Sequence, residues 1–148
     1  MVSDERTLGL DFGGARCGVA ITDELGRMAH PRPNLDARNR DRLVEELVNI
    51  VHAENIARIV VGLPLEKSGR EGHSARLARA FAHRLADATG LAVVLWDERM
   101  SSVEAGRALQ TSGVNARRAK SLIDGAAAMT ILQSYLDAQE GGAERLTS

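Results

Sequence analysis

Two continuous apolar runs separated by one amphipathic segment constrain the fold of this chain more than any other feature. The runs are "IARIVVGLP" (56–64) and "LAVVLW" (91–96), and "HSARLARAFAHRLADATG" (73–90) lies between them. Continuous apolar runs are typical of strands that are covered on both faces of a sheet. The segment between them has helical spacing, and a strand–helix–strand order requires parallel pairing with a right-handed crossover. The sequence therefore predicts an α/β fold.

The first third of the chain predicts an antiparallel meander. "TLGLDFG" and "CGVAITD" have the pattern of two strands joined by a tight glycine-rich turn. "GRMAHPRPNL" predicts a third strand, which Pro31 and Pro33 restrict to an edge of the sheet or to the strand's end. "RDRLVEELVNIVHAEN" predicts the helix that follows, with Asp36 or Asn39 as its N-cap. The expected architecture is one mixed sheet with helices on both faces.

Two more helices are expected after the second apolar run. "SSVEAGRALQ" (101–110) begins with Ser101 and Glu104 at capping-box spacing, and "AKSLIDGAAAMTILQSYLDAQ" (119–139) predicts the last helix. The polar, glycine-containing end of the chain is expected to fray. A chain of this length forms one domain. We therefore expect one domain over 1–139 and a flexible tail over 140–148.

Composition excludes several classes of protein. The net charge is −1, so there is no overall basic character, and only 3% of the residues are aromatic, which argues against modules that stack bases on rings. Cys17 is the only cysteine, which excludes an internal disulfide and a thiolate zinc cluster. No apolar run approaches the length of a membrane span, and no signal peptide is evident, so we expect a cytoplasmic protein. No oligomeric state follows from the sequence.

Acidic residues stand at positions where a buried charge is costly. Asp11 ends the first predicted strand, Asp97 and Glu98 end the last one, and Asp124 lies among small apolar residues of the last predicted helix. Ligand sites of open α/β sheets lie outside the carboxyl ends of the strands. If the first and last strands lie close together in the sheet, these acids can converge there.

Each acid also has a simpler interpretation. Asp11 could cap the turn that follows it, Asp97 or Glu98 could pair with Arg99, and Asp124 could lie on the exposed side of its helix. Adjacent strand residues face opposite ways, so the pattern does not decide between Asp97 and Glu98. Glu98 has the longer reach and is favoured, with Asp97 as a second ligand or a structural support.

A divalent cation would relieve the repulsion between converging carboxylates. Mg²⁺ and Mn²⁺ take oxygen ligands, and two such ions about 4 Å apart can activate water and stabilise the leaving oxygen in phosphodiester cleavage. The four histidines show no spacing typical of metal ligands. We therefore expect a carboxylate site for Mg²⁺ or Mn²⁺, with two metals.

Three motifs together resemble the YqgF family, which is described both as Holliday junction resolvases and as nucleases of precursor 16S ribosomal RNA. They are "LGLDFGGARCGVAITD", "IVVGLPLEKSGREG", and "WDERMSSVEA" followed by "SLIDGAAAMTILQSYLD", which together span nearly the whole chain in family order. The resemblance implies a ribonuclease H-like fold and metal-dependent phosphodiester hydrolysis. It implies Asp11, Glu98 and Asp124 as catalytic and metal-binding acids, with Asp97 as the secondary acid.

Two departures qualify the resemblance. Ser101 and Ser102 stand where the family usually has Ser-Thr or Thr-Thr, and a serine hydroxyl still serves as a helix cap. True junction resolvases of the superfamily carry an acid near the end of the strand that here is "IVVGLP". Gly62 and Pro64 occupy that region, with no carboxylate before Glu66. The resemblance therefore does not by itself imply resolvase activity.

Candidate contacts with substrate lie in three places. Glycines after Asp11 allow close approach of a phosphate, although a plain tight turn explains them as well. The loop "PLEKSGREGHS" and the basic stretch "TSGVNARRAKS" offer cations, and Arg99 could neutralise the acids or contact the scissile phosphate. The residues we assign to substrate binding are Gly13, Gly14, Arg16, Lys67, Arg70, Arg99, Arg117, Arg118 and Lys120.

Four functions are compatible with these features. The first is a metal-dependent nuclease that processes the precursor end of 16S ribosomal RNA, and the second is the same chemistry on branched DNA. The third is an actin-like phosphate-binding protein, which would need a second lobe that one domain does not provide. The fourth is a non-catalytic protein that docks on ribosomes or transcription complexes. Because every acid of the motif is present, we favour a nuclease over the fourth function. The first two need the same acids and are not separated by the sequence, and we take ribosomal RNA as the expected substrate.

Overall fold

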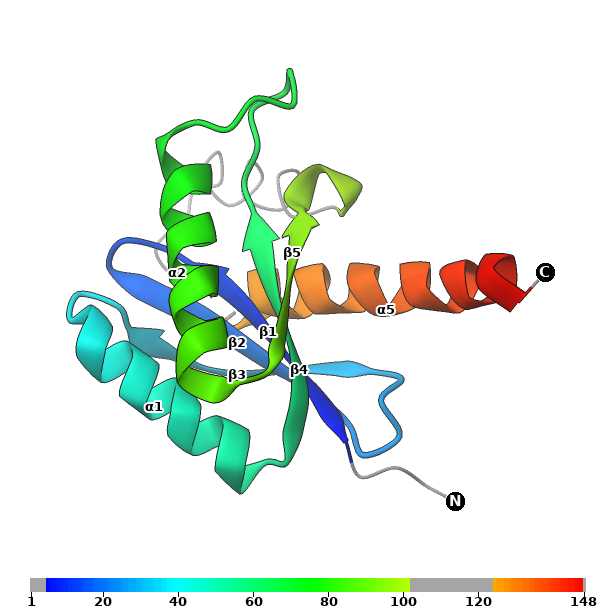
Figure 1. Cartoon of the computed structure of the whole chain (residues 1–148), viewed down its shortest axis with the longest axis horizontal. Coiled ribbons are helices and arrows are strands. Elements are labelled where there is room, and N and C mark those ends of the chain that lie inside the picture. The colour runs from blue at the N-terminus through cyan, green and yellow to red at the C-terminus, as the bar shows by residue number, and fades with distance from the viewer. Residues whose placement is uncertain (1–4, 102–123, 148) are drawn as a thin grey trace, which may run out of the picture.

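The computed structural model describes residues 5–101 and 124–147 of the chain. Figure 1 shows one central sheet with helices on both sides. In chain order the elements are β1 (Arg6–Phe12), β2 (Arg16–Thr22), β3 (Ala29–Asp36), α1 (Arg40–Ala53), β4 (Ile56–Leu63), α2 (His73–Thr89), β5 (Ala92–Asp97), a 3₁₀ turn (Glu98–Met100) and α5 (Ala126–Thr147).

The sheet has the order β3-β2-β1-β4-β5. The first three strands pair in antiparallel fashion, and β1, β4 and β5 are parallel, which confirms the predicted mixed sheet. Pro31 and Pro33 lie on the edge strand β3, as their missing N–H groups require. The prediction of a buried last strand is wrong for the described residues, because β5 ends the strand order and its residues are exposed or half-buried.

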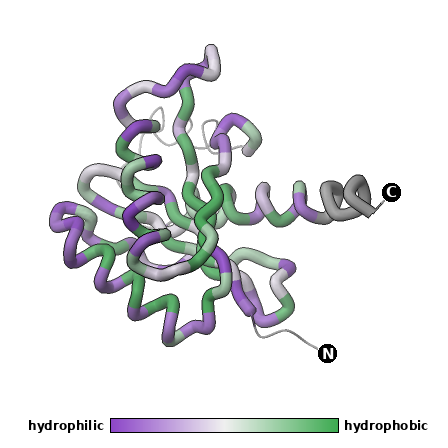
Figure 2. Tube along the Cα trace, in the orientation of Figure 1, coloured by the Kyte–Doolittle hydropathy of each residue, from purple (hydrophilic) through white to green (hydrophobic). Residues whose placement is uncertain are grey.

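Two apolar layers lie on opposite faces of the sheet. Helices α1 and α2 cover one face, and α5 packs on the other. Figure 2 shows the apolar residues concentrated along the strands and the polar residues on the outer sides of the helices. None of the described helices is both long and apolar enough to cross a membrane. The side chains that carry the α5 layer are Ala20, Ala29, Val60, Ala128, Ile131, Leu132 and Tyr135.

Glycines on the strands let α5 approach the sheet closely. A Cβ on Gly9 would stand 2.7 Å from the Cβ of Leu132, and one on Gly62 would stand 2.6 Å from Cδ1 of Ile131. The contact at Gly9 is with a Cβ next to the helix backbone, so a side chain there would displace the helix, whereas at Gly62 the end of the Ile131 side chain would have to move. This part of α5 therefore packs directly against β1 and β4.

The caps of the two outer helices follow the sequence. The side chain of Asn39, one of the two predicted N-caps of α1, accepts a hydrogen bond from the backbone N–H of Arg42. Asp36, the other candidate, instead binds Arg38. Gly90 ends α2 in the left-handed conformation with a φ of 71°.

The last helix begins later than the sequence predicts. The apolar spacing predicts a helix from residue 119, but the described helix starts at Ala126, and Gly125 before it has a φ of +76°. Asp124 therefore lies in a turn and not on a helix. The helix continues to Thr147, through most of the predicted tail, and the boundary at 139 stays a prediction. The helix predicted after Ser101 lies outside the described residues.

The only cysteine, Cys17, provides a test of the apolar layer between the sheet and helices α1 and α2. Cys17 is fully buried, and burial, with a smaller contribution from the negative charge of Asp11, raises the pKa of its thiol to about 12. We expect iodoacetamide at pH 8 to modify Cys17 only after unfolding, because the thiolate is the reactive form. Mass spectrometry of the native and urea-unfolded protein measures this, and rapid native labelling would contradict the packing.

The same shift has a consequence for stability. The unfolded thiol has a pKa of about 8.5, so its contribution to folding is complete below that pH. The contribution declines as the pH rises from there toward the folded value of about 12.

Candidate active site

Asp11 lies near the carboxyl end of β1 and faces helix α5. It stands opposite Gly18 on β2. A Cβ on Gly18 would lie 3.3 Å from the Cβ of Asp11 and 3.6 Å from the Cβ of Ala128, which is on α5. The carboxylate is thus on the α5 face and is half-buried. A side chain at position 18 would force Asp11 to shift by a few tenths of an ångström.

Glu98 reaches the same face from the end of β5. Its side chain is 2% exposed, and Oε2 lies 3.0 Å from the place where a Cβ on Gly62 would stand. The last registered pair of β1 and β4 is Leu10 with Val61, and Asp11 and Gly62 are the next residues of these parallel strands. Glu98 therefore covers the glycine that flanks Asp11, so the inward-facing acid of the pair is Glu98.

Asp97 has a different environment. Its carboxylate binds the guanidinium of Arg99, with Nη2 2.7 Å from Oδ2, and accepts the backbone N–H of Arg99 as well. The hydrogen bonds from the Arg99 side chain, more than those from its backbone, hold the pKa of Asp97 below its usual range. Pairing with Arg99 was the alternative interpretation of these acids, and the structure shows it for Asp97.

Asp124 lies on the β3 side of Asp11 and is exposed. Its Oδ1 accepts a hydrogen bond from Nδ2 of Asn34 at 3.2 Å, and its Oδ2 accepts one from the backbone N–H of Asn34 at 3.4 Å. The next residue, Gly125, donates its N–H to Oδ1 of the same asparagine at 3.1 Å. Asn34 thus ties Asp124 and the start of α5 to the edge strand.

The acids form a row across one edge of the sheet, in the order Glu98, Asp11, Asp124. From the sequence, these acids are expected to converge if the first and last strands lie close together. In the structure, β4 lies between β1, which carries Asp11, and β5, which leads to Glu98. The three acids thus lie along this edge of the sheet, and their joint metal site stays a prediction. In the described part of the chain, no three Asp, Glu, His or Cys side chains are grouped as a metal site.

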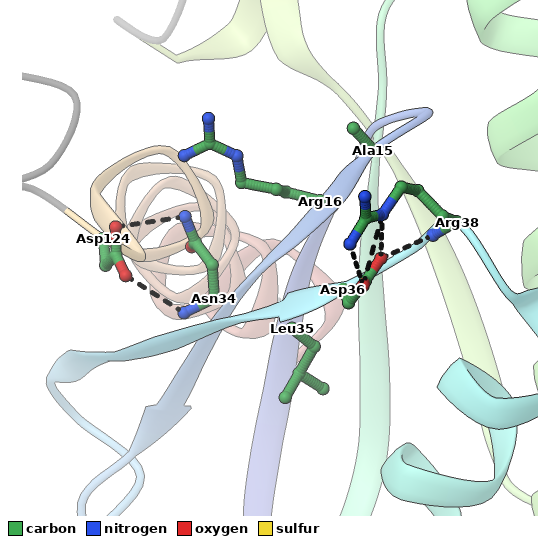
Figure 3. Close-up of a pocket in the computed structure, with 7 residues that line it drawn as sticks. All are labelled: Ala15, Arg16, Asn34, Leu35, Asp36, Arg38 and Asp124. Carbon is green, nitrogen blue, oxygen red and sulfur yellow. Dashed lines mark hydrogen bonds and ion pairs between the residues drawn. The ribbon is translucent and has the colours of Figure 1, made fainter. Parts of the chain in front are cut away.

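The turn after Asp11 leads to an open hollow beside the row. The backbone N–H of Gly13 donates to the carbonyl of Arg16 at 2.9 Å, which confirms the predicted tight turn. Figure 3 shows Arg16 extending above the strands between Asp124 and Arg38. Arg16 is exposed and has no ion pair within the described ranges. The hollow has a volume of about 520 Å³ and is lined by Ala15, Arg16, Asn34, Leu35, Asp36, Arg38 and Asp124.

The remaining predicted cations are distributed differently. Lys67 and Arg70 are exposed on the loop between β4 and α2. Arg99 binds this loop, because its Nη1 donates to the carbonyl of Lys67 at 3.3 Å while its guanidinium pairs with Asp97. Arg99 is therefore engaged in holding the loop to the end of β5. The basic residues Arg117, Arg118 and Lys120 lie outside the described residues.

Asn34 is the site residue that sequence reasoning missed. It stands in a proline-containing edge strand, and no charge or motif spacing marks it. Its position depends on a bulge, because Cys17 pairs with Leu35 whereas Val19 pairs with Arg32. Two residues of β3 therefore oppose Gly18 alone, which turns Asn34 toward α5. Such a register shift depends on the packed sheet and is not visible in the pattern of side chains.

Comparison with known proteins identifies the family. The family model described as "RuvX: Holliday junction resolvase" matches residues 5–138. A protein from Anaeromyxobacter sp. (strain Fw109-5) is 44% identical over 132 residues, which cover 89% of this chain and 96% of that protein. One from Chloroflexus aurantiacus (strain J-10-fl) is 38% identical and covers 97% of this chain and 94% of its own length. Both carry the name "Putative pre-16S rRNA nuclease".

Solved structures agree on the fold. The Thermus thermophilus RuvC structure in complex with a Holliday junction superimposes with a TM-score of 0.61 at 14% identity, and covers 93% of this chain and 96% of that one. This likeness supports the ribonuclease H-like fold, and the sequence matches identify the family. The chain belongs to the RuvX family, the YqgF family that its motifs resemble, and is a nuclease.

Proposed function

We propose that this nuclease hydrolyses phosphodiester bonds at the precursor end of 16S ribosomal RNA, with Asp11, Glu98 and Asp124 as its catalytic acids. The observation that carries the proposal is the row of these acids on the α5 face. A half-buried and a fully buried carboxylate flank the same glycine, Gly62, at the carboxyl edge of the sheet. Carboxylates are costly to bury in this way, and a cation bound between them would offset that cost.

The chemical type of the ligand atoms fits a hard divalent cation. Each of the three acids offers carboxylate oxygens, which Mg²⁺ and Mn²⁺ prefer. Asp11 occupies the centre of the row. It would hold the cation together with Glu98 on the β4 side and Asp124 on the β3 side. The ligand set would be completed by water and by the phosphate of the substrate.

The chain's own groups define what happens at the site. A bound divalent cation supplies charge stabilisation and lowers the pKa of water. Asp11 would hold the cation to which the scissile phosphate binds, and the glycine turn that follows leaves room for the backbone of the nucleic acid. The neighbouring Arg16 gives a mobile phosphate contact in the hollow. Lys67 and Arg70 extend the positive surface on the far side of Glu98.

The similarity in sequence to named proteins favours RNA over branched DNA as the substrate, because it is closer than the similarity to the RuvC structure. The relatives at 38–44% identity are named for pre-16S ribosomal RNA, whereas the RuvC complex with a DNA junction is 14% identical. Branched DNA is the second candidate, because the matching family model is described as a Holliday junction resolvase. Against it, the end of β4 carries Gly62 and Pro64 and no carboxylate.

Cleavage of two labelled substrates in parallel tests the proposal. One is an RNA spanning the precursor end of 16S ribosomal RNA and the other is a four-way DNA junction, each with Mg²⁺ and with Mn²⁺. We expect the RNA to be cut, and Asp124→Asn to reduce the rate by about 100-fold or more, since it removes a direct metal ligand. Asp87→Asn, a change of an exposed acid on α2, is the matched control and should leave the rate unchanged.

Each other outcome has a defined meaning. Cleavage of the junction alone would replace RNA by branched DNA as the substrate. Cleavage of neither substrate by folded protein with metal present would contradict the catalytic proposal and favour the docking protein.

A further inference from the structure

The amide of Asn34 has its two ends bound to two different parts of the same turn. Its oxygen accepts the N–H of Gly125 at 3.1 Å, and its nitrogen donates to Oδ1 of Asp124 at 3.2 Å. An N–H group needs an acceptor and a carboxylate needs a donor, so these partners fix the orientation of the amide. The backbone N–H of Asn34 adds a further bond to the other carboxylate oxygen, Oδ2.

From this geometry we infer that Asn34 is a positioning residue, which holds the carboxylate of Asp124 for the metal next to Asp11. The inference rests on the proposed function, because it assigns Asn34 a role only through Asp124. Asn34 also lies next to the central acid. Its Oδ1 and the Cβ of Asp11 stand 3.7 Å and 3.3 Å from the same point, the place of a Cβ on Gly18.

Asp124 needs such a holder because its own backbone supplies little constraint. It lies in a turn, is exposed, and precedes a glycine in the left-handed conformation. A free carboxylate there would sample several rotamers, and fixing it on metal binding would cost conformational entropy. Hydrogen bonds from a neighbouring residue that orient a ligating carboxylate typically change metal affinity or activity by 10- to 100-fold. The two bonds from Asn34 are of this kind.

The bulge explains why residue 34 can do this. Because Pro33 and Asn34 together oppose Gly18, the side chain of Asn34 turns toward the first residues of α5. If the register of Val19 with Arg32 continued without the bulge, Pro33 would stand opposite Gly18, and Asn34 would stand opposite Cys17 and face the other side of the sheet. The irregularity of β3 thus places a donor pair at the acid that comes from the other end of the chain.

A double-mutant cycle with Mn²⁺ binding as its readout tests the inference. The dissociation constant for Mn²⁺ alone is measured by water proton relaxation for wild type, Asn34→Ala, Asp124→Asn and the double variant. We expect Asn34→Ala to weaken binding by about tenfold in the wild-type background. In the Asp124→Asn background it should have no further effect, because the two residues act as one unit. Asn49→Ala, at an exposed position of α1, is the control.

A second variant separates positioning from anchoring of the helix. Asn34→Asp keeps an oxygen that can accept the N–H of Gly125, but it loses the donor and repels Asp124. If Asn34 only anchors α5, this variant would cleave RNA and unfold like wild type, and the inference would be overturned. We expect instead that cleavage falls by about tenfold while the melting temperature stays close to that of the control Asn49→Asp.

The remaining outcomes are also decisive. Unchanged Mn²⁺ binding by Asn34→Ala, or equal weakening in both backgrounds, would overturn the role of Asn34 and leave the proposed function intact. Unchanged binding and cleavage by Asp124→Asn would overturn the assignment of Asp124, and the inference with it.

Discussion

Replacing Glu98 by glutamine is expected to reduce cleavage by about 100-fold or more, whereas Asp97→Asn is expected to keep activity within about fivefold of wild type. The reason is that adjacent acids have opposite environments. Glu98 is 2% exposed and covers Gly62 beside Asp11, and Asp97 is already neutralised by Arg99. Removing a partly exposed ion pair costs about 1 kcal/mol of folding stability at most, so Asp97→Asn should leave the protein folded and the other acids in place.

Initial rates on the precursor RNA measure this pair of variants, and thermal unfolding shows that both are folded. The two changes are chemically equivalent, since each replaces one carboxylate oxygen by an amide, so each serves as the control for the other. Equal losses of activity would mean that Asp97 takes part in the site as well. A greater loss in Asp97→Asn would assign the ligand to Asp97 and contradict the geometry.

The fold could be predicted from the sequence wherever local pattern decides it. Continuous apolar runs gave β4 and β5, and helical spacing with its caps gave α1 and α2. Two proline residues placed β3 at an edge. The start of the last helix could not be predicted in this way. The spacing predicts one helix from residue 119, whereas α5 starts at Ala126, directly after Gly125, which is packed against β2 and β3. That contact joins segments about ninety residues apart and leaves no local signal.

In the candidate site, too, some features follow from local pattern and others from long-range packing. The acids are visible in sequence because a carboxylate in an apolar run is unusual, and Asp11 and Glu98 lie on the α5 face. Their order across the sheet depends on β4 lying between β1 and β5. The position of Asp124 depends on Asn34 and on a bulge. A pattern of side chains predicts which groups carry charge, but the distances between them are set by strand register and packing.

Gly125→Ala is expected to destabilise the protein much more than Gly26→Ala. A Cβ at this position would stand 2.7 Å from the carbonyl oxygens of both Arg32 and Val19, and the φ of +76° is unfavourable for alanine. Both contacts are with backbone, so no side chain can move aside. We expect the free energy of unfolding to fall by about 3 kcal/mol or more, as for other overpacked sites with backbone strain.

Gly26→Ala separates the effect of the close backbone contacts from the effect of the positive φ. Gly26 has nearly the same backbone conformation, with a φ of +70°, but no atom lies within 4 Å of its Cβ position. Alanine there should cost only the conformational term, about 1 kcal/mol. Urea unfolding of both variants gives the difference. Equal losses would mean that the contact of Gly125 with β2 and β3 is not tight. A larger loss at Gly125, together with weaker cleavage by the folded fraction, would show that the packing that starts α5 also positions Asp124.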